Sequence, residues 1–151
     1  KEKLWTLMLP MLETLEMVLG TEKFKYMIEH NDIMIEAIEN VRGRSYRNAI
    51  IIVDESQNIT PTEINALVTR LEDDSQIIII GDSRQHDMKC GETGISFLVN
   101  LIRELKIKKP MYLDDDDLDI LFQDISCVTF NQDDIVRSGL TKLFCKVFDN
   151  R

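Results

Sequence analysis

The chain has 151 residues, the size of one ordinary domain, and 44% of them are apolar, enough to build a single core. Its formal net charge of -9 argues against a protein that coats nucleic acid non-specifically, because such binding depends on Lys and Arg meeting phosphates, so any nucleic-acid contact must be local. Three cysteines without a C-x-x-C pair predict no disulfide framework and favour a reducing cytoplasm. No stretch approaches the roughly 18 uninterrupted apolar residues of a membrane span, so we expect no membrane partner.

The first third of the chain predicts two helices and a strand. Apolar residues from Leu4 to Leu19 recur at steps of three and four, which is helical spacing, and Pro10 should kink or divide that helix. Thr21 is expected to cap a second, short helix that runs through Ile28. Residues 33–37 alternate between apolar and polar side chains, which predicts a strand.

The middle of the chain predicts a βαβ unit. Ala49 to Val53 form a β-branched run typical of a central parallel strand. Residues 60–63 read Thr-Pro-Thr-Glu, which is a capping box with proline at the first helical position. A second buried strand is expected over Ile77 to Ile80, so the two strands should flank one helix in a parallel sheet.

The last third predicts further helices and one more strand. Helical spacing covers Ile95 to Leu105, and residues 106–119 are expected to form a solvated connection. Within it, four consecutive aspartates could bind calcium, although a surface loop is the simpler interpretation. Residues 126–130 are expected to be the last strand, and 133–148 the final helix. The order of elements predicts an α/β fold with a mostly parallel sheet.

An acidic pair stands at the end of the first predicted buried strand, where residues 50–57 read IIIVDESQ. The carboxyl edge of a parallel sheet is where functional loops gather. In phosphoryl transfer from a nucleotide, one carboxylate at such a place holds Mg²⁺ and a neighbour orients the attacking water. Asp54 suits the first role and Glu55 the second. The structural alternative is an acidic pair that ends a strand and starts a turn.

A second polar motif follows the next buried strand and decides between these interpretations. Gly81 and Asp82 come directly after Ile80, and Gln85 lies three residues further on. These side chains should reach the same sheet edge as Asp54 and Glu55, and a glutamine there can bind water or a terminal phosphate. Two buried strands with acidic ends, separated by one capped helix, favour a nucleotide site.

With these motifs, the sequence resembles the PhoH family, P-loop ATPases whose motor core is similar to that of superfamily 1 helicases. The resemblance implies a P-loop NTPase (RecA-like) three-layer fold, with residues 1–151 as the carboxyl-terminal part of one domain. It implies ATP and Mg²⁺ as ligands, Asp54 holding Mg²⁺ through water, Glu55 as the catalytic carboxylate and Gln85 as a sensor of the terminal phosphate. The residues that carry it are Arg42-Gly43-Arg44, residues 50–58, Thr60-Pro61, Gly81-Asp82 with Gln85 and Asp87, and residues 134–137.

Three arginines are candidates for phosphate contacts, because a guanidinium can clamp phosphate oxygens in two-pronged fashion. By resemblance, Arg137 could act as an arginine finger within the chain or across a subunit boundary. A salt bridge to Asp133 or Asp134 is its structural alternative. Arg42 and Arg44 flank a glycine before the acidic strand and could touch phosphate, nucleic acid or only the acidic surface.

A phosphate loop of the form G-x-x-x-x-G-K-S/T is absent from the sequence. In the family this loop precedes the matching region, so we expect the chain to begin downstream of it. It could have been removed, lie on another chain or have been lost. Because that loop grips the phosphates, residues 1–151 alone should bind ATP weakly and hydrolyse it little.

The leading hypothesis is a PhoH-like ATP-binding protein that, by resemblance, couples hydrolysis to remodelling of RNA or DNA, with single-stranded nucleic acid as partner and a ring-forming homo-oligomer as assembly. We expect a cytoplasmic location. The many Ile and Asp residues would suit a bacteriophage protein, and in that case the location would be the host cytoplasm. The alternative is a non-catalytic interaction module that keeps the P-loop fold. A magnesium nuclease using Asp54, Glu55 and Asp82 is a third option. A zinc site lacks ligands, since the chain has two histidines and no repeated Cys or His spacing.

Overall fold

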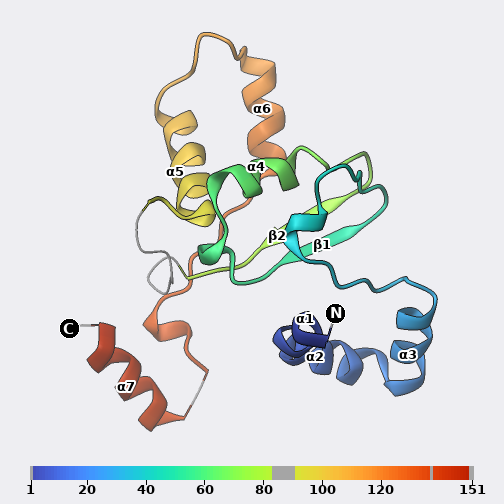
Figure 1. The fold of residues 1–151 in the computed structure, drawn as a ribbon. Coiled ribbons are helices and arrows are strands. Elements are labelled where there is room, and N and C mark those ends of the chain that lie inside the picture. Colours follow the sequence, from blue (N-terminus) through green and yellow to red (C-terminus); the bar gives the residue numbers. More distant parts are fainter. Residues whose placement is uncertain (1, 83–90, 137, 150–151) are drawn as a thin grey trace. The chain divides into compact units, whose positions relative to one another are not determined.

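A computed structural model describes residues 2–82, 91–136 and 138–149 (Figure 1). The described chain divides into two compact units, Lys1–Leu101 and Ile102–Arg151. The first unit holds three amino-terminal helices, a βαβ unit and the first part of the helix that follows it, and the regular structure described in the second unit is helical. None of the helices in the described ranges is both long and apolar enough to cross a membrane.

The amino-terminal helices are α1 (Glu2–Leu7), α2 (Leu9–Leu19) and α3 (Thr21–Glu29). The expected division near Pro10 is confirmed, because α2 begins one residue before the proline, which sits in the first turn where its missing N–H costs nothing. The expected cap at Thr21 is wrong. Gly20, with a φ of 82°, precedes α3 instead, and its carbonyl accepts a hydrogen bond from the Phe24 N–H at 3.0 Å.

The strand expected over residues 33–37 is wrong. This segment has no regular structure and leads into a short 3-10 helix, η1 (Ile38–Asn40). A strand needs the backbone of a partner strand, and alternation of side chains does not supply one. Glu36 in this segment instead accepts a hydrogen bond from the Tyr46 hydroxyl at 3.0 Å.

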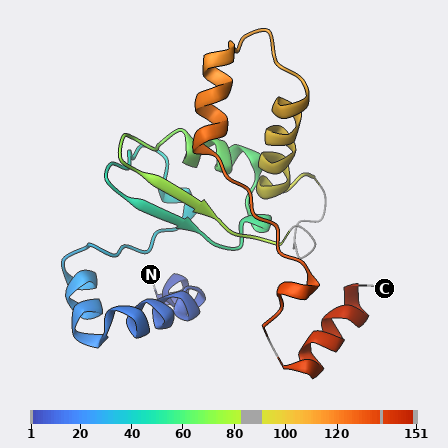
Figure 2. The same ribbon diagram turned by 180° about the vertical axis from the view of Figure 1, so that it is seen from behind.

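The predicted βαβ unit is confirmed. Strands β1 (Ile50–Val53) and β2 (Gln76–Ile79) pair in parallel, with Ile50 opposite Gln76 and Val53 opposite Ile79. Helix α4 (Pro61–Val68) lies between them in the chain, after a second 3-10 helix, η2 (Ser56–Asn58). Figures 1 and 2 show the two strands side by side from opposite directions.

The capping box at the start of α4 is also confirmed. Thr60 Oγ1 accepts a hydrogen bond from the Glu63 N–H at 3.3 Å, and Glu63 Oε2 accepts one from the Thr60 N–H at 2.9 Å. Hydrogen bonds from the Thr60 backbone and hydroxyl, helped by the nearby Arg42 charge, lower the pKa of Glu63 against the opposing effect of burial. The box sets where α4 starts and therefore the length of the loop that carries the acidic pair.

One face of the two-stranded sheet is covered and the other is exposed. Side chains of successive strand residues point to opposite faces. The covered face packs on the main core, whose buried members are Val41, Val53, Ile59, Ile64 and Leu67, joined by partly buried Ile51, Ile77, Ile79 and Leu98. The opposite face carries Ile50, Ile52, Ile78 and Ile80, which are 69%, 38%, 40% and 47% exposed.

Helix α5 (Gly94–Ile107) starts in close contact with the loop before α4. The Gly94 N–H donates to the Ile59 carbonyl at 2.6 Å, and a Cβ at Gly94 would meet Ile64 Cγ1. Thr93, 4% exposed, accepts a hydrogen bond from the Ser96 N–H through its hydroxyl at 3.2 Å and so caps the helix. The predicted helix over residues 95–105 is confirmed, and it starts in this close contact with the core.

The second unit differs more from the sequence expectations. Part of the expected connection is helix α6 (Asp115–Asp124), with Asp114 as its cap and acidic residues in its first turn. Aspartates at a helix amino terminus are favoured by the helix dipole, which explains the aspartate run without a metal. Within the described residues no group of three or more His, Cys, Asp or Glu is arranged to hold a metal ion.

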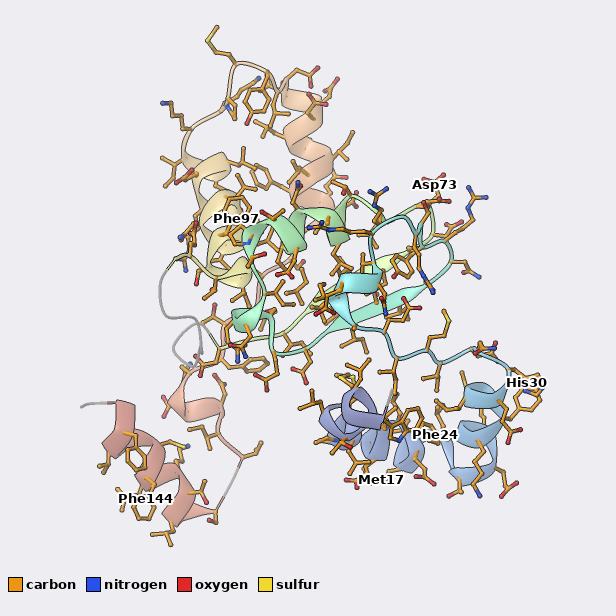
Figure 3. All side chains as sticks on the ribbon, viewed as in Figure 1. Met17, Phe24, His30, Asp73, Phe97 and Phe144 are labelled. Carbon is orange, nitrogen blue, oxygen red and sulfur yellow. The ribbon has the colours of Figure 1, made fainter. Side chains whose placement is uncertain are left out.

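The strand expected over residues 126–130 is wrong, because no described segment pairs with these residues. The final helix expected over 133–148 begins later than predicted. A 3-10 turn, η3 (Gln132–Asp134), comes first, and α7 runs from Gly139 to Asp149. Figure 3 shows Phe144 on α7, where its ring stacks on that of Phe148 with 6.2 Å between centroids.

Candidate active site

The acidic pair lies directly after β1, in the turn that leads to α4. Glu55 adopts a left-handed backbone conformation, with φ 53° and ψ 36°. For a residue other than glycine this conformation costs about 1–2 kcal/mol, and such costs concentrate at functional sites. Two hydrogen bonds hold the turn: the Glu55 N–H donates to Asp54 Oδ1 at 2.9 Å, and the Asn58 N–H donates to the Glu55 carbonyl at 2.9 Å. Both carboxylates are exposed.

Backbone hydrogen bonds join the turn to the end of β2. The Ser56 N–H donates to the Ile80 carbonyl at 3.0 Å, and the Ile80 N–H donates to the Val53 carbonyl at 2.8 Å. Ser56 and Gln57 are 0% and 4% exposed. The loop after β1 and the loop after β2 therefore meet at the carboxyl edge of the sheet, as the parallel topology predicts.

Gln57 joins the two loops through its side chain. Its Nε2 donates to Glu55 Oε2, and its Oε1 accepts a hydrogen bond from the Asp82 N–H at 3.2 Å. Gln57 was not among the site residues predicted from the sequence. Its position two residues after Glu55 was the one feature of the sequence that could have indicated a role in the site. Only the fold of the turn shows that its side chain points inward.

Gly81 is required by the close approach of the two loops. A Cβ at this position would lie 2.5 Å from Ser56 Oγ and 2.8 Å from Gln57 Oε1. Ser56 Oγ is itself buried and has no hydrogen-bond partner among the described residues. An unpartnered buried hydroxyl is a cost to the folded state.

We predict that Gly81→Ala destabilises the fold by about 1–3 kcal/mol because the added methyl overpacks this contact. Ser56→Ala should instead stabilise by about 1 kcal/mol, since it removes the unpartnered hydroxyl. In the double variant the cost of Gly81→Ala should shrink but persist, because Gln57 Oε1 still lies 2.8 Å from the new Cβ. Urea unfolding of the four proteins measures the coupling, and strict additivity would contradict the contact.

Of the predicted ligands, the structure brings Asp54, Glu55 and Asp82 to the same sheet edge. Oxygen donors are what Mg²⁺ prefers, and Mg²⁺ is commonly bound through one or two protein carboxylates together with substrate phosphates. The carboxylates at this edge fit that requirement. They do not form an all-protein cage among the described residues.

Arg44 and Arg42, before β1, have different surroundings. Arg44 forms an ion pair with Glu36, which also accepts a hydrogen bond from the Tyr46 hydroxyl. Tyr46 pairs through its backbone with residues that precede β2, at the amino-terminal edge of the sheet, opposite the acidic pair. Burial, and then the Glu36 carboxylate, raise the pKa of Tyr46. Arg42 lines a hollow of about 250 Å³ with Glu63 and Ala66.

Two of the predicted site residues, Gln85 and Arg137, lie outside the described residues. Their assigned roles, as sensor of the terminal phosphate and as arginine finger, stay predictions.

Comparison with known proteins gives the family. The family model described as "PhoH-like protein" matches residues 1–149. The chain belongs to the PhoH-like family. It is 28% identical over 152 residues to a PhoH-like protein of Bacillus subtilis, covering 100% of this chain and 42% of that protein. It is 28% identical over 134 residues to Protein PhoH of Escherichia coli, covering 87% of this chain and 33% of that protein.

A third, shorter match is to a protein named PhoH2. Protein PhoH2 of Bacillus subtilis is 35% identical over 91 residues, which are 58% of this chain and 21% of that protein. No solved structure matches the chain significantly. The chain therefore spans less than half the length of these curated relatives.

Proposed function

We propose that this chain supplies the acidic half of an ATP-hydrolysing site in a PhoH-like P-loop ATPase. The observation that carries the proposal is the meeting of two strand-end loops, where Glu55, in a left-handed conformation, is linked by Gln57 to the backbone of Asp82. Strain at a carboxylate and a buried polar link between loops are features expected of a site that positions charge.

Each carboxylate has a separate task in this proposal. Asp54, exposed and one residue from the strand end, holds Mg²⁺ through water, and Asp82 adds negative charge from the neighbouring loop. Bound Mg²⁺ would neutralise charge on the phosphates of ATP. Glu55 orients and deprotonates the attacking water, because a carboxylate within hydrogen-bonding reach can accept its proton.

The exposed face of the sheet supports a larger, three-layer P-loop fold. Parallel sheets are nearly always covered on both faces, yet Ile50 and Ile78 are 69% and 40% exposed here. In this proposal, further elements of the ATPase domain cover that face and bring a phosphate loop to the acidic edge. Gln85 and Arg137 complete the site, and remodelling of RNA or DNA by a ring of subunits is the expected use of the hydrolysis.

The proposal is tested by measuring Mg²⁺-dependent ATP affinity by titration calorimetry. The chain of 151 residues is compared with a longer one, extended on its amino-terminal side to include a phosphate loop. We expect weak binding to the former, and binding to the latter that falls strongly when EDTA removes Mg²⁺ or when Asp54 is changed to Asn. Failure of the longer chain to bind ATP would favour a non-catalytic interaction module.

RNA degradation without ATP is a separate outcome. If Mg²⁺ supports cleavage of a labelled single-stranded RNA in the absence of nucleotide, and Asp54→Asn abolishes that cleavage, the chain is a nuclease and the ATPase proposal is wrong.

A further inference from the structure

We propose that Gln57 is a positioning residue that holds the Glu55 carboxylate in a fixed relation to the loop after β2. This inference rests on the proposed function and deepens it. Glu55 itself is exposed and sits on a turn of only a few residues, so its backbone alone does not fix the direction of its side chain.

The orientation of the Gln57 amide follows from its two partners. The backbone N–H of Asp82 can only donate, so it requires the oxygen of the amide, at 3.2 Å. That places the amide nitrogen on the side of Glu55 Oε2, which can only accept when the carboxylate is ionised. The two hydrogen bonds therefore demand the same orientation, and each one supports the other.

Burial makes this link specific. Gln57 is 4% exposed, and a buried amide that loses a partner destabilises the folded state because water does not replace that partner. Gly81, with no side chain, lets the amide lie against the loop, since a Cβ there would sit 2.8 Å from Gln57 Oε1. A shift of the loop at Asp82 would thus displace the amide, and with it the Glu55 carboxylate.

Two substitutions separate the two hydrogen bonds of this link, the Asp82 half (from the Asp82 N–H to Gln57 Oε1) and the Glu55 half (from Gln57 Nε2 to Glu55 Oε2). Gln57→Glu keeps an oxygen that can accept from the Asp82 N–H but removes the donor to Glu55 and places a second carboxylate beside it. Gln57→Met has a similar length and removes both hydrogen bonds. Gln76→Met is the matched control, because Gln76 is exposed at the start of β2, away from the acidic edge.

Amide hydrogen exchange, followed by NMR in the chain of 151 residues, tests the Asp82 half without any need for turnover. We expect exchange at Asp82 to be about tenfold faster in Gln57→Met than in the wild type, and near the wild-type rate in Gln57→Glu and Gln76→Met. Unchanged exchange in Gln57→Met would overturn the inference. If Gln57→Met does not fold, faster exchange at Asp82 in the folded Gln57→Glu variant would overturn it instead.

Steady-state ATP hydrolysis in the longer chain tests the Glu55 half. Gln57→Glu should lower kcat about tenfold or more with KM within about twofold, since a misplaced catalytic group slows the chemical step more than it weakens binding. Wild-type kcat in Gln57→Glu would overturn the positioning role. If the wild type itself shows no hydrolysis, the proposed function fails, and the exchange result alone decides whether Gln57 links the loops.

Discussion

Under the proposed function, replacing Glu55 with glutamine should lower ATP hydrolysis by about 100-fold or more, the usual effect of removing a general base, while Mg²⁺-dependent ATP binding persists. Glutamine has the same length and keeps an oxygen that can accept the hydrogen bond from Gln57 Nε2. The substitution therefore removes the charge and basicity of the carboxylate without breaking the link between the loops. The measurement is phosphate release by the longer chain with its phosphate loop.

Comparison with Asp54→Asn distinguishes the two carboxylates. If Asp54 holds Mg²⁺, Asp54→Asn should weaken nucleotide binding. Glu55→Gln should leave nucleotide affinity within about threefold of the wild type, because a residue that acts only in the chemical step contributes to the rate and not to binding. Hydrolysis by Glu55→Gln at the wild-type rate would remove Glu55 from the reaction. Equal losses of binding in both variants would show that the two residues share one task.

The βαβ unit was predictable because each of its parts has a local signal. The β-branched run before Asp54 predicts a buried strand, and the Thr60–Glu63 capping box with Pro61 sets the start of α4 to the residue. Parallel strands place their carboxyl ends at one edge, so the meeting of the loops after β1 and β2 also followed from the sequence.

The two strands that were wrong, over residues 33–37 and 126–130, show what local pattern lacks. Alternation records which side chains could face a core, but a strand exists only where another backbone completes its hydrogen bonds. Helix α6 was missed for the opposite reason. Its aspartate run suggested solvent, although acidic residues are favoured in the first turn of a helix.

Within the candidate site, the carboxylates were predictable and their setting was not. The left-handed conformation of Glu55 and the inward direction of Gln57 depend on a turn held by the end of β2. Arg44 forms an ion pair with Glu36, and no helix or strand contains both residues, so no regular spacing predicts the contact. Side-chain partners that come together only in the folded chain leave no signal in spacing.

Gly94→Ala, at the start of α5, should destabilise the first unit by about 3 kcal/mol, the upper end of the usual cost of overpacking. A Cβ at Gly94 would meet Ile64 Cγ1 and would lie 2.9 Å from the Ile59 carbonyl oxygen. Ile64 is 1% exposed and belongs to the main core, so it cannot turn aside, and the carbonyl is held by its own hydrogen bond to the Gly94 N–H. Moving α5 outward would break that bond.

Gly139→Ala is the matched control, because a Cβ there has no described atom within 4 Å and Gly139 also begins a helix, α7. Alanine favours a helix over glycine by up to about 1 kcal/mol, so this variant should be neutral or slightly more stable. Urea unfolding followed by circular dichroism compares the two. If both substitutions have the same small effect, α5 does not start against Ile59 and Ile64, and the loop that leads from the acidic pair to α4 has more freedom than its hydrogen bonds indicate.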